Sequence, residues 1–178
     1  MNITKVAITG HSKGLGQILF ERYKKKGLDV FGASRQNGFD LNDNKKLDLF
    51  CDSIRDYDLL INNAPGPFQK HVLRKMFQEW KGKEKIIMNI GSRTTQFSVA
   101  QAMDYGTEKA ALDFFARSAQ HFGEKFPHVL LIRPGFFGGN RSRSKPVEKI
   151  EIADVAELVE FMVDNVDRFR IFDMVVSK

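Results

Sequence analysis

Hydrophobic and polar positions follow two alternating periods along the chain. Short runs that are apolar throughout indicate buried strands, and each is followed by apolar residues at helical spacing. The expected strands lie at residues 2–9, 28–34, 57–63, 85–92, 128–135 and 170–176. The expected helices lie at residues 15–23, 42–55, 70–80 and 105–122, with a last one beginning at Asp154.

This alternation of strands and helices predicts an α/β fold. Strands that are apolar throughout are buried on both faces, as in a parallel sheet covered by helices on each side. We therefore expect one domain over residues 1–178, built on a doubly wound, Rossmann-like parallel sheet. The letters DVAE at Asp154 have the spacing of a helix capping box. Folds of this kind bind their ligands beyond the carboxyl ends of the strands.

The composition of the chain indicates where in the cell the protein is expected. No apolar run is long enough to cross a membrane, and no secretion leader precedes the first strand, so we expect a cytoplasmic protein without a membrane partner. Cys51 is the single cysteine, which excludes an internal disulfide. Its apolar neighbours predict a buried position on a helix.

The formal net charge of +6 suits an anionic ligand or a nucleic acid. The basic residues are scattered, however, with small clusters at residues 24–26, 81–85 and 141–145. Scattered clusters are typical of solvated helix faces and loops rather than of a nucleic-acid groove. We therefore expect a small anionic ligand and no nucleic-acid partner.

A glycine-rich turn joins the first strand to the first helix, in the stretch VAITGHSKGLGQILF. Gly10 allows a tight turn, Gly14 lets the backbone approach a phosphate, and Gly16 allows close packing of helix against strand. The helix N-terminus that follows offers free N–H groups to a pyrophosphate. This combination predicts a dinucleotide site.

The end of the second strand indicates which dinucleotide is bound. A site for NAD has Asp or Glu there for the ribose 2′-hydroxyl, whereas this chain has Ser34 and Arg35. A guanidinium can pair with a 2′-phosphate through two hydrogen bonds, and Lys13 adds a second cation from the glycine turn. Together these residues favour NADP(H).

Tyr105 and Lys109 lie four positions apart on an expected helix, so they share one face. A fixed ammonium near a phenol favours the phenolate and makes the phenol a better proton donor and acceptor at neutral pH. Ser92 ends the strand KIIMNIGS, at the sheet edge where a ligand is expected. Its hydroxyl is placed to hold a substrate oxygen.

The motifs TGHSKGLG, NNA, IGS, YGTEKAAL and RPG, in this order, resemble those of the short-chain dehydrogenase/reductase family. The resemblance covers essentially the whole chain. It implies an NADPH-dependent oxidoreductase that transfers hydride between the nicotinamide and a small carbonyl or alcohol substrate. It also implies a homodimer or homotetramer.

The resemblance assigns roles to individual residues. Tyr105 would be the general acid/base, Lys109 would lower its pKa and bind the nicotinamide ribose, and Ser92 would orient the substrate carbonyl. Asp40 would contact the adenine. The implied cofactor-binding residues are Gly10, Ser12, Lys13, Gly14, Leu15, Gly16, Ser34, Arg35, Asp40, Leu41, Asn62, Ala64, Tyr105, Lys109, Pro134 and Gly135. No metal ligands are implied.

The chain departs from the family pattern at several positions. Pro65 stands where the family usually has glycine, and no asparagine occurs between Asn63 and Asn89 to complete the usual catalytic tetrad. The threonine that follows the Pro-Gly motif is replaced around residues 138–139, and the segment after the second strand is too short for the usual helix.

These departures leave other functions open. The alternative hypothesis is a catalytically weak or inactive NADP(H)-binding sensor or scaffold of the same fold. The sequence NRSRSKP at residues 140–146 leaves nucleic-acid binding as a third, less favoured hypothesis. Phe114 and Phe115 belong either to a dimer interface or to the core.

Overall fold

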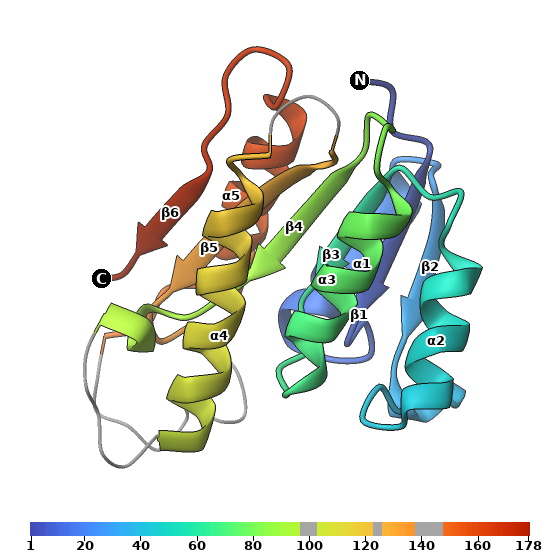
Figure 1. The fold of residues 1–178 in the computed structure, drawn as a ribbon. Helices are drawn as coiled ribbons and strands as arrows, with labels where there is room; N and C mark the ends of the chain where they lie inside the picture. The colour runs from blue at the N-terminus through green and yellow to red at the C-terminus, as the bar shows by residue number, and fades with distance from the viewer. Residues whose placement is uncertain (97–102, 123–125, 138–147) are drawn as a thin grey trace.

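The computed structural model describes residues 1–96, 103–122, 126–137 and 148–178. Its centre is a six-stranded, all-parallel sheet with the strand order β2-β1-β3-β4-β5-β6 (Figure 1). The strands are β1 Lys5–Thr9, β2 Asp29–Ala33, β3 Leu59–Asn62, β4 Ile86–Ile90, β5 His128–Pro134 and β6 Asp173–Val176. The helices are α1 Gly14–Lys25, α2 Asn44–Ser53, α3 Phe68–Glu79, α4 Met103–Ala119 and α5 Ile152–Asp164, with 3₁₀-helices η1 Arg35–Asn37 and η2 Arg93–Gln96.

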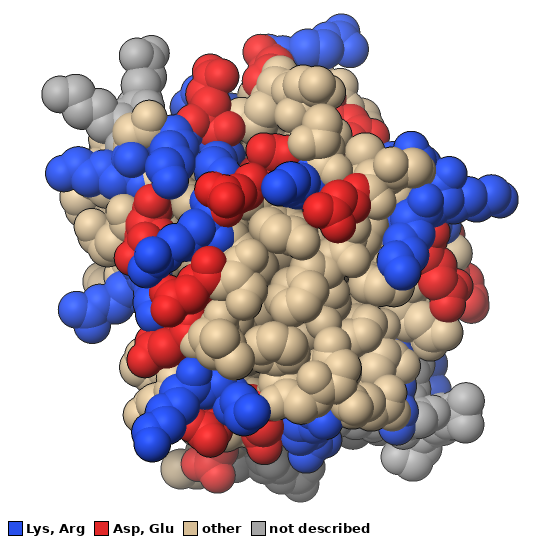
Figure 2. All heavy atoms as spheres, turned by 90° about the vertical axis from the view of Figure 1, so that its right-hand side faces the viewer, with Lys and Arg blue, Asp and Glu red and all other residues tan. Residues whose placement is uncertain are grey.

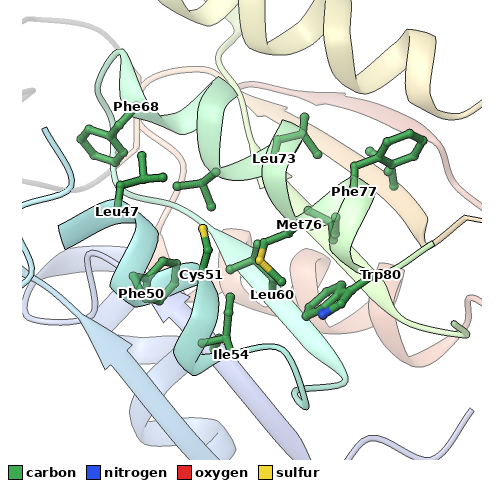
Figure 3. Packing of buried hydrophobic residues seen from close by; sticks show 14 of the residues in the cluster. Leu47, Phe50, Cys51, Ile54, Leu60, Phe68, Leu73, Met76, Phe77 and Trp80 are labelled. Atoms are coloured by element: carbon green, nitrogen blue, oxygen red, sulfur yellow. The ribbon is translucent and has the colours of Figure 1, made fainter. Parts of the chain in front are cut away.

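Helices cover both faces of the sheet, which confirms the predicted fold class. One core lies between the sheet and α2, α3 and α4, and the other lies between the sheet and α1 and α5 (Figure 1). Figure 3 shows the first core, to which Phe50 and Cys51 of α2, Met76 of α3 and Trp80, directly after α3, contribute side chains. The alternation of buried strands with amphipathic helices was therefore a sound guide to the layers.

The order of the strands fixes where a ligand can lie. From β1 the chain first adds β2 on one side and then crosses to add β3 on the other, so the connections diverge at the carboxyl ends of β1 and β3. Thr9, at the end of β1, accepts hydrogen bonds on Oγ1 from the backbone N–H groups of Asn63 (2.9 Å) and Ala64 (3.0 Å). These bonds hold the loop after β3 against the end of β1.

The start of α5 differs from the prediction. The helix begins at Ile152 with Glu151 as its N-cap residue, and no side chain caps it, so the capping box expected at Asp154 is wrong. Ile150 is buried and forms a β-bridge with Phe137, so the extended segment ends there and the helix begins directly afterwards. A tertiary contact thus decides the boundary instead of the local capping signal.

The connection between β2 and α2 is short, as expected. It contains only the single 3₁₀ turn η1 before Asp43 caps α2 by accepting hydrogen bonds from the backbone of Lys45 and Lys46. Across the described ranges, the structure has no helix whose length and hydrophobicity would let it span a membrane.

Candidate functional site

The glycine turn after β1 is tightly packed at two of its three glycines. Gly10 has φ +72°, and a Cβ atom there would lie 3.0 Å from the Cβ of Ala64. A Cβ on Gly16 would lie 2.7 Å from Nδ2 of Asn63 and closer still to the carbonyl oxygen of Gly10. Both positions therefore require glycine, because α1 starts in contact with the turn and the loop after β3.

Gly14 plays a different part in the same turn. It has φ +59°, and a side chain there would meet open space, so its conformation rather than crowding favours glycine. It begins α1, whose N-cap residue Lys13 makes no side-chain capping bond. The first N–H groups of α1 are therefore left for an external acceptor, which is the arrangement of an anion site.

The remaining residues of the turn divide between surface and core. Ser12 is half-buried and Lys13 is exposed, whereas the side chain of Leu15 is buried in the core between the sheet and α1. The His11 ring lies 4.9 Å from the Phe20 ring, centroid to centroid, with the planes tilted by 39°. It also covers Gly32 of β2, where any Cβ would overlap the imidazole. The imidazole thus fixes the turn against the end of β2.

Arg35 and Ser34 follow β2 directly. Asn37 Oδ1 accepts hydrogen bonds from the backbone N–H (2.8 Å) and Oγ (3.3 Å) of Ser34, which closes η1 and exposes Arg35. Within the described residues, neither the Arg35 guanidinium nor the Lys13 ammonium has a side-chain hydrogen bond or an ion pair. Two unpaired cations therefore flank the uncapped end of α1.

Asp40 and Leu41 lie farther along the same connection. Oδ1 of Asp40 already accepts hydrogen bonds from Asn42, through its backbone N–H (3.2 Å) and its Nδ2 (3.0 Å). The side chain of Leu41 is buried in the core against α2 and α3, so only its main chain can contact a ligand.

Four of the expected cofactor-binding residues lie at the ends of two strands: Asn62 and Ala64 at the end of β3, and Pro134 and Gly135 at the end of β5. The Asn62 side chain is fully buried and points into the interior, where Nδ2 bonds to the Gln69 carbonyl oxygen at 2.9 Å. Ala64 abuts Gly10, as described above. Pro134 is buried at the end of β5, and the N–H of Gly135 donates to Val176 of β6 at 2.7 Å.

Tyr105 and Lys109 project from the first turns of α4 into a hollow of about 210 Å³. The hollow is lined by Pro65, Gly66, Pro67, Asp104, Tyr105, Glu108 and Lys109. Tyr105 is 41% exposed and Lys109 only 3%, and the Nζ atom of Lys109 lies 5.8 Å from the centroid of the Tyr105 ring. The structure thus brings a reachable phenol and a buried ammonium together, as the four-residue spacing predicted.

Ser92 follows β4 and is nearly buried. Its Oγ lies 3.0 Å from Oγ1 of Thr94 and accepts a hydrogen bond from the Thr94 backbone N–H at 3.2 Å. Thr95 Oγ1 lies 2.9 Å from the Ser92 carbonyl oxygen and 2.6 Å from Oδ2 of Asp113. These contacts fix the turn that presents Ser92.

Asp113 is a buried carboxyl group that the sequence analysis did not identify. Burial raises its pKa, although the Thr95 hydrogen bond and the charge of Arg133 oppose this shift. The Thr95 hydroxyl lies within hydrogen-bond distance of both the Ser92 carbonyl oxygen and Oδ2 of Asp113, so Asp113 helps to hold the turn that presents Ser92.

Gln69 was also missed. Its Oε1 accepts a hydrogen bond from Nζ of Lys109 at 2.8 Å, across 40 positions of sequence. The missing asparagine in this part of the chain did not point to a glutamine. The available signal was the position of Gln69 on the inner face of α3, which is otherwise apolar.

The charged side chains give no support to a nucleic-acid groove on the face that carries β2 and α2. Figure 2 shows Lys and Arg beside Asp and Glu around an uncharged centre. Ion pairs such as Lys75 with Asp48 (2.6 Å) and Arg55 with Asp52 (3.0 Å) account for part of this mixing. The basic cluster at 141–145 and the replaced threonine position at 138–139 lie outside the described residues.

The two phenylalanines of α4 divide between surface and core. Phe114 is 74% exposed, whereas Phe115 packs against the core beside Phe77. In the part of the chain that the structure covers, no group of His, Cys, Asp or Glu is arranged to hold a metal ion.

The fold is that of solved short-chain dehydrogenases. A short chain dehydrogenase from Burkholderia cenocepacia, crystallised with NADP, matches with a TM-score of 0.84 and 18% identity, over 98% of this chain and 88% of that chain. Serine dehydrogenase from Escherichia coli matches with a TM-score of 0.75 and 18% identity, over 97% and 96% of the two chains. An alcohol dehydrogenase from the archaeon Thermococcus sibiricus, complexed with 5-hydroxy-NADP, matches with a TM-score of 0.75 and 16% identity, over 97% and 95%.

No protein-family model matches the sequence, and no curated protein matches it. The likeness is therefore one of three-dimensional structure at low identity, and it establishes the fold.

Proposed function

We propose that this chain is an NADP(H)-dependent oxidoreductase that interconverts a small carbonyl compound and the corresponding alcohol. The observation that carries the proposal is the hollow beside α4, where the exposed phenol of Tyr105 lies over the buried ammonium of Lys109. The short-chain dehydrogenase fold agrees with this chemistry. The substrate would enter at the hollow and meet Tyr105.

The residues around the end of β1 fit a phosphorylated dinucleotide. Gly10 and Gly16 leave a turn without side chains, and the uncapped N-terminus of α1 suits a pyrophosphate. Lys13 and Arg35 suit the additional 2′-phosphate of NADP(H). When bound, this cofactor supplies or accepts the hydride.

The chain's own residues handle the proton. In the reducing direction the Tyr105 hydroxyl donates its proton to the substrate oxygen as the carbonyl becomes an alcohol, and in the oxidising direction it takes that proton back. The Lys109 ammonium stabilises the phenolate that is left after donation. The Ser92 hydroxyl can donate a hydrogen bond to the same substrate oxygen once it turns away from Thr94.

Replacing Tyr105 with Phe tests this proposal. NADPH oxidation, followed by absorbance with a panel of carbonyl compounds, should be abolished in Tyr105→Phe, whereas the NADPH dissociation constant should stay within about twofold. Tyr57→Phe is the matched control, because Tyr57 packs near Phe31 on the β2 side of the sheet. Unchanged turnover in Tyr105→Phe would refute the catalytic assignment.

The same panel of carbonyl compounds distinguishes the oxidoreductase from an NADP(H)-binding protein without activity. NADPH binding without turnover of any carbonyl or alcohol would favour a binding protein of the same fold. Failure to bind either pyridine nucleotide in calorimetry would exclude both.

A further inference from the structure

Lys109 is held in place by the protein itself. It is the only lysine among the buried residues that the structure describes. Its Nζ donates hydrogen bonds to the Ile90 carbonyl oxygen at the end of β4 (2.7 Å) and to Oε1 of Gln69 on α3 (2.8 Å). Both acceptors favour the charged ammonium form over the neutral amine.

The orientation of the Gln69 amide is determined by its neighbours. Its Nε2 lies 2.6 Å from the Asn62 carbonyl oxygen and 3.0 Å from that of Ile90, so both amide protons are donated to carbonyls. A flipped amide would set oxygen against two carbonyl oxygens and an NH₂ group against an ammonium. Oε1 therefore faces Lys109.

Two further amides anchor Gln69 to the sheet. Asn62 Nδ2 donates to the Gln69 carbonyl oxygen and to Oδ1 of Asn89, each at 2.9 Å, and Asn89 Nδ2 donates to the Leu130 carbonyl oxygen at 3.2 Å. The three amide side chains are all buried. They tie α3 to β3, β4 and β5, so buried hydrogen bonds hold the residue that accepts from Lys109.

We propose that Gln69 is a positioning residue, whose neutral amide holds the Lys109 ammonium against the end of β4 so that its charge acts on Tyr105. This role rests on the proposed function, because it concerns the same phenol. An amide oxygen holds the ammonium without cancelling its charge. A carboxylate at this position would hold it equally well but would neutralise it.

Other charges near the hollow come from three elements. Asp104 and Glu108 of α4 line it, Lys70 of α3 pairs with Glu108 at 3.2 Å, and Arg93 lies in η2, which packs against α4. These groups are unchanged by a substitution at Gln69. A shift in Tyr105 titration caused by such a substitution therefore reports on the Lys109 ammonium together with its partner at position 69.

The test is a spectroscopic titration of tyrosinate in the free protein, which needs neither cofactor nor substrate. Burial raises the pKa of Tyr23 and of Tyr57, with nearby carboxylates adding to both shifts. The transition that disappears in Tyr105→Phe is assigned to Tyr105. Gln69→Met and Gln69→Glu should each move it upward by about one pH unit, which corresponds to a tenfold change in the ionisation constant.

Asn89→Leu is the matched control. It removes a buried amide of the same network that does not touch Lys109, so it should lower the thermal midpoint while leaving the Tyr105 transition in place. If Gln69→Met fails to fold, Gln69→Glu and Asn89→Leu still decide the question. A Tyr105 transition that is the same in the folded Gln69 variants and in the parent would overturn the positioning role.

Kinetics distinguish a failure of this inference from a failure of the proposed function. With an accepted substrate, Gln69→Met should lower kcat at neutral pH about tenfold and shift its pH profile upward, with a smaller change in the KM for NADPH. Turnover with a parental pH profile in Gln69→Met refutes positioning alone. No turnover in the parent protein refutes the oxidoreductase, while the titration still tests the contact with Lys109.

Discussion

Lys13 and Lys109 are the same residue type in two opposite settings of the proposed site. Lys13 is exposed beside the uncapped end of α1 and has no side-chain partner among the residues described. Lys109 is 3% exposed and bound to two oxygens of the protein. Lys13 is therefore free to pair with an anionic ligand, whereas the position of Lys109 is set when the protein folds.

Dissolved salt and side-chain entropy should affect the exposed Lys13 more than the buried Lys109. Exposed charges are screened by salt over a Debye length of about 8 Å at physiological ionic strength, whereas buried charges are screened much less. Side-chain entropy also differs, because a free lysine must be ordered when its ligand arrives. The turn after β1 therefore suits reversible capture, and the end of β4 suits a fixed catalytic charge.

The largest expected effect comes from removing the fixed charge. Lys109→Met keeps the length and the apolar stem of the side chain but leaves Tyr105 without its cation, so kcat should fall by about 10²–10⁴-fold, the range that general acid–base catalysis contributes. Steady-state kinetics with NADPH and a substrate from the carbonyl panel measure it. Lys13→Met, at an exposed lysine of the same site, is the control and should keep kcat at saturating NADPH.

A smaller effect should follow from reversing the charge at Arg35. Arg35→Asp places a carboxylate where a 2′-phosphate is expected, so NADPH binding should weaken about 10- to 100-fold, since a hydrogen bond to a charged group contributes about 1.5–3 kcal/mol. NADH binding should change far less. Calorimetric titration with both nucleotides checks this, and an unchanged preference would contradict the assignment of NADP(H).

Salt provides a finer test of the same contrast. The NADPH affinity of the parent protein should fall as salt is raised, and Lys13→Met should reduce that dependence along with a loss of affinity of about tenfold or less. The Tyr105 ionisation should move little over the same salt range, because Lys109 is buried. If salt changed the NADPH affinity and the Tyr105 ionisation equally, the proposed distinction between an exposed Lys13 and a shielded Lys109 would be wrong.

A carboxylate at the opposite end of the sheet shows the same principle through stability. Asp58 accepts hydrogen bonds from the backbone of Thr4 (2.9 Å) and Lys5 (3.0 Å), and these bonds outweigh its partial burial and lower its pKa. Because the pKa is lower in the folded state, the ionised carboxylate stabilises the fold at pH values above the unfolded-state pKa of about 3.9. This stabilisation is lost as pH falls through the folded-state pKa.

Asp58→Asn should therefore lower the free energy of unfolding by about 1 kcal/mol at neutral pH. The difference between parent and variant should begin to shrink as pH falls below the unfolded-state value of about 3.9, and should vanish once pH passes the lower folded-state value, where the parent carboxylate is protonated. Urea unfolding at neutral and acidic pH measures both. A difference that is independent of pH would contradict the role of the Asp58 charge.

Local signals were sufficient for the layers and for the glycine turn. The positive φ of Gly10 and the close packing of Gly16 match the tight turn and the helix–strand contact that their spacing predicted. The pairing of Tyr105 with Lys109 was predictable as well, since residues four apart share a helix face.

Contacts between distant residues were beyond the sequence alone. Gln69 lies 40 positions from Lys109, and only the packing of α3 beside α4 brings them together. The start of α5 followed a bridge at Ile150 rather than the capping signal at Asp154. Leu41 was expected at the cofactor, and the burial of its side chain in the core, which leaves only its main chain for such a contact, was not visible in the sequence.

The buried position of Cys51, the single cysteine, makes its thiol a probe of local unfolding. Cys51 is sealed between α2 and α3 (Figure 3), and burial raises the pKa of its thiol to about 12. Alkylating reagents attack the thiolate, so labelling near neutral pH must wait for α2 to separate from the sheet. The rate of alkylation, with and without NADPH, would then measure how far a bound nucleotide restrains that separation from a distance.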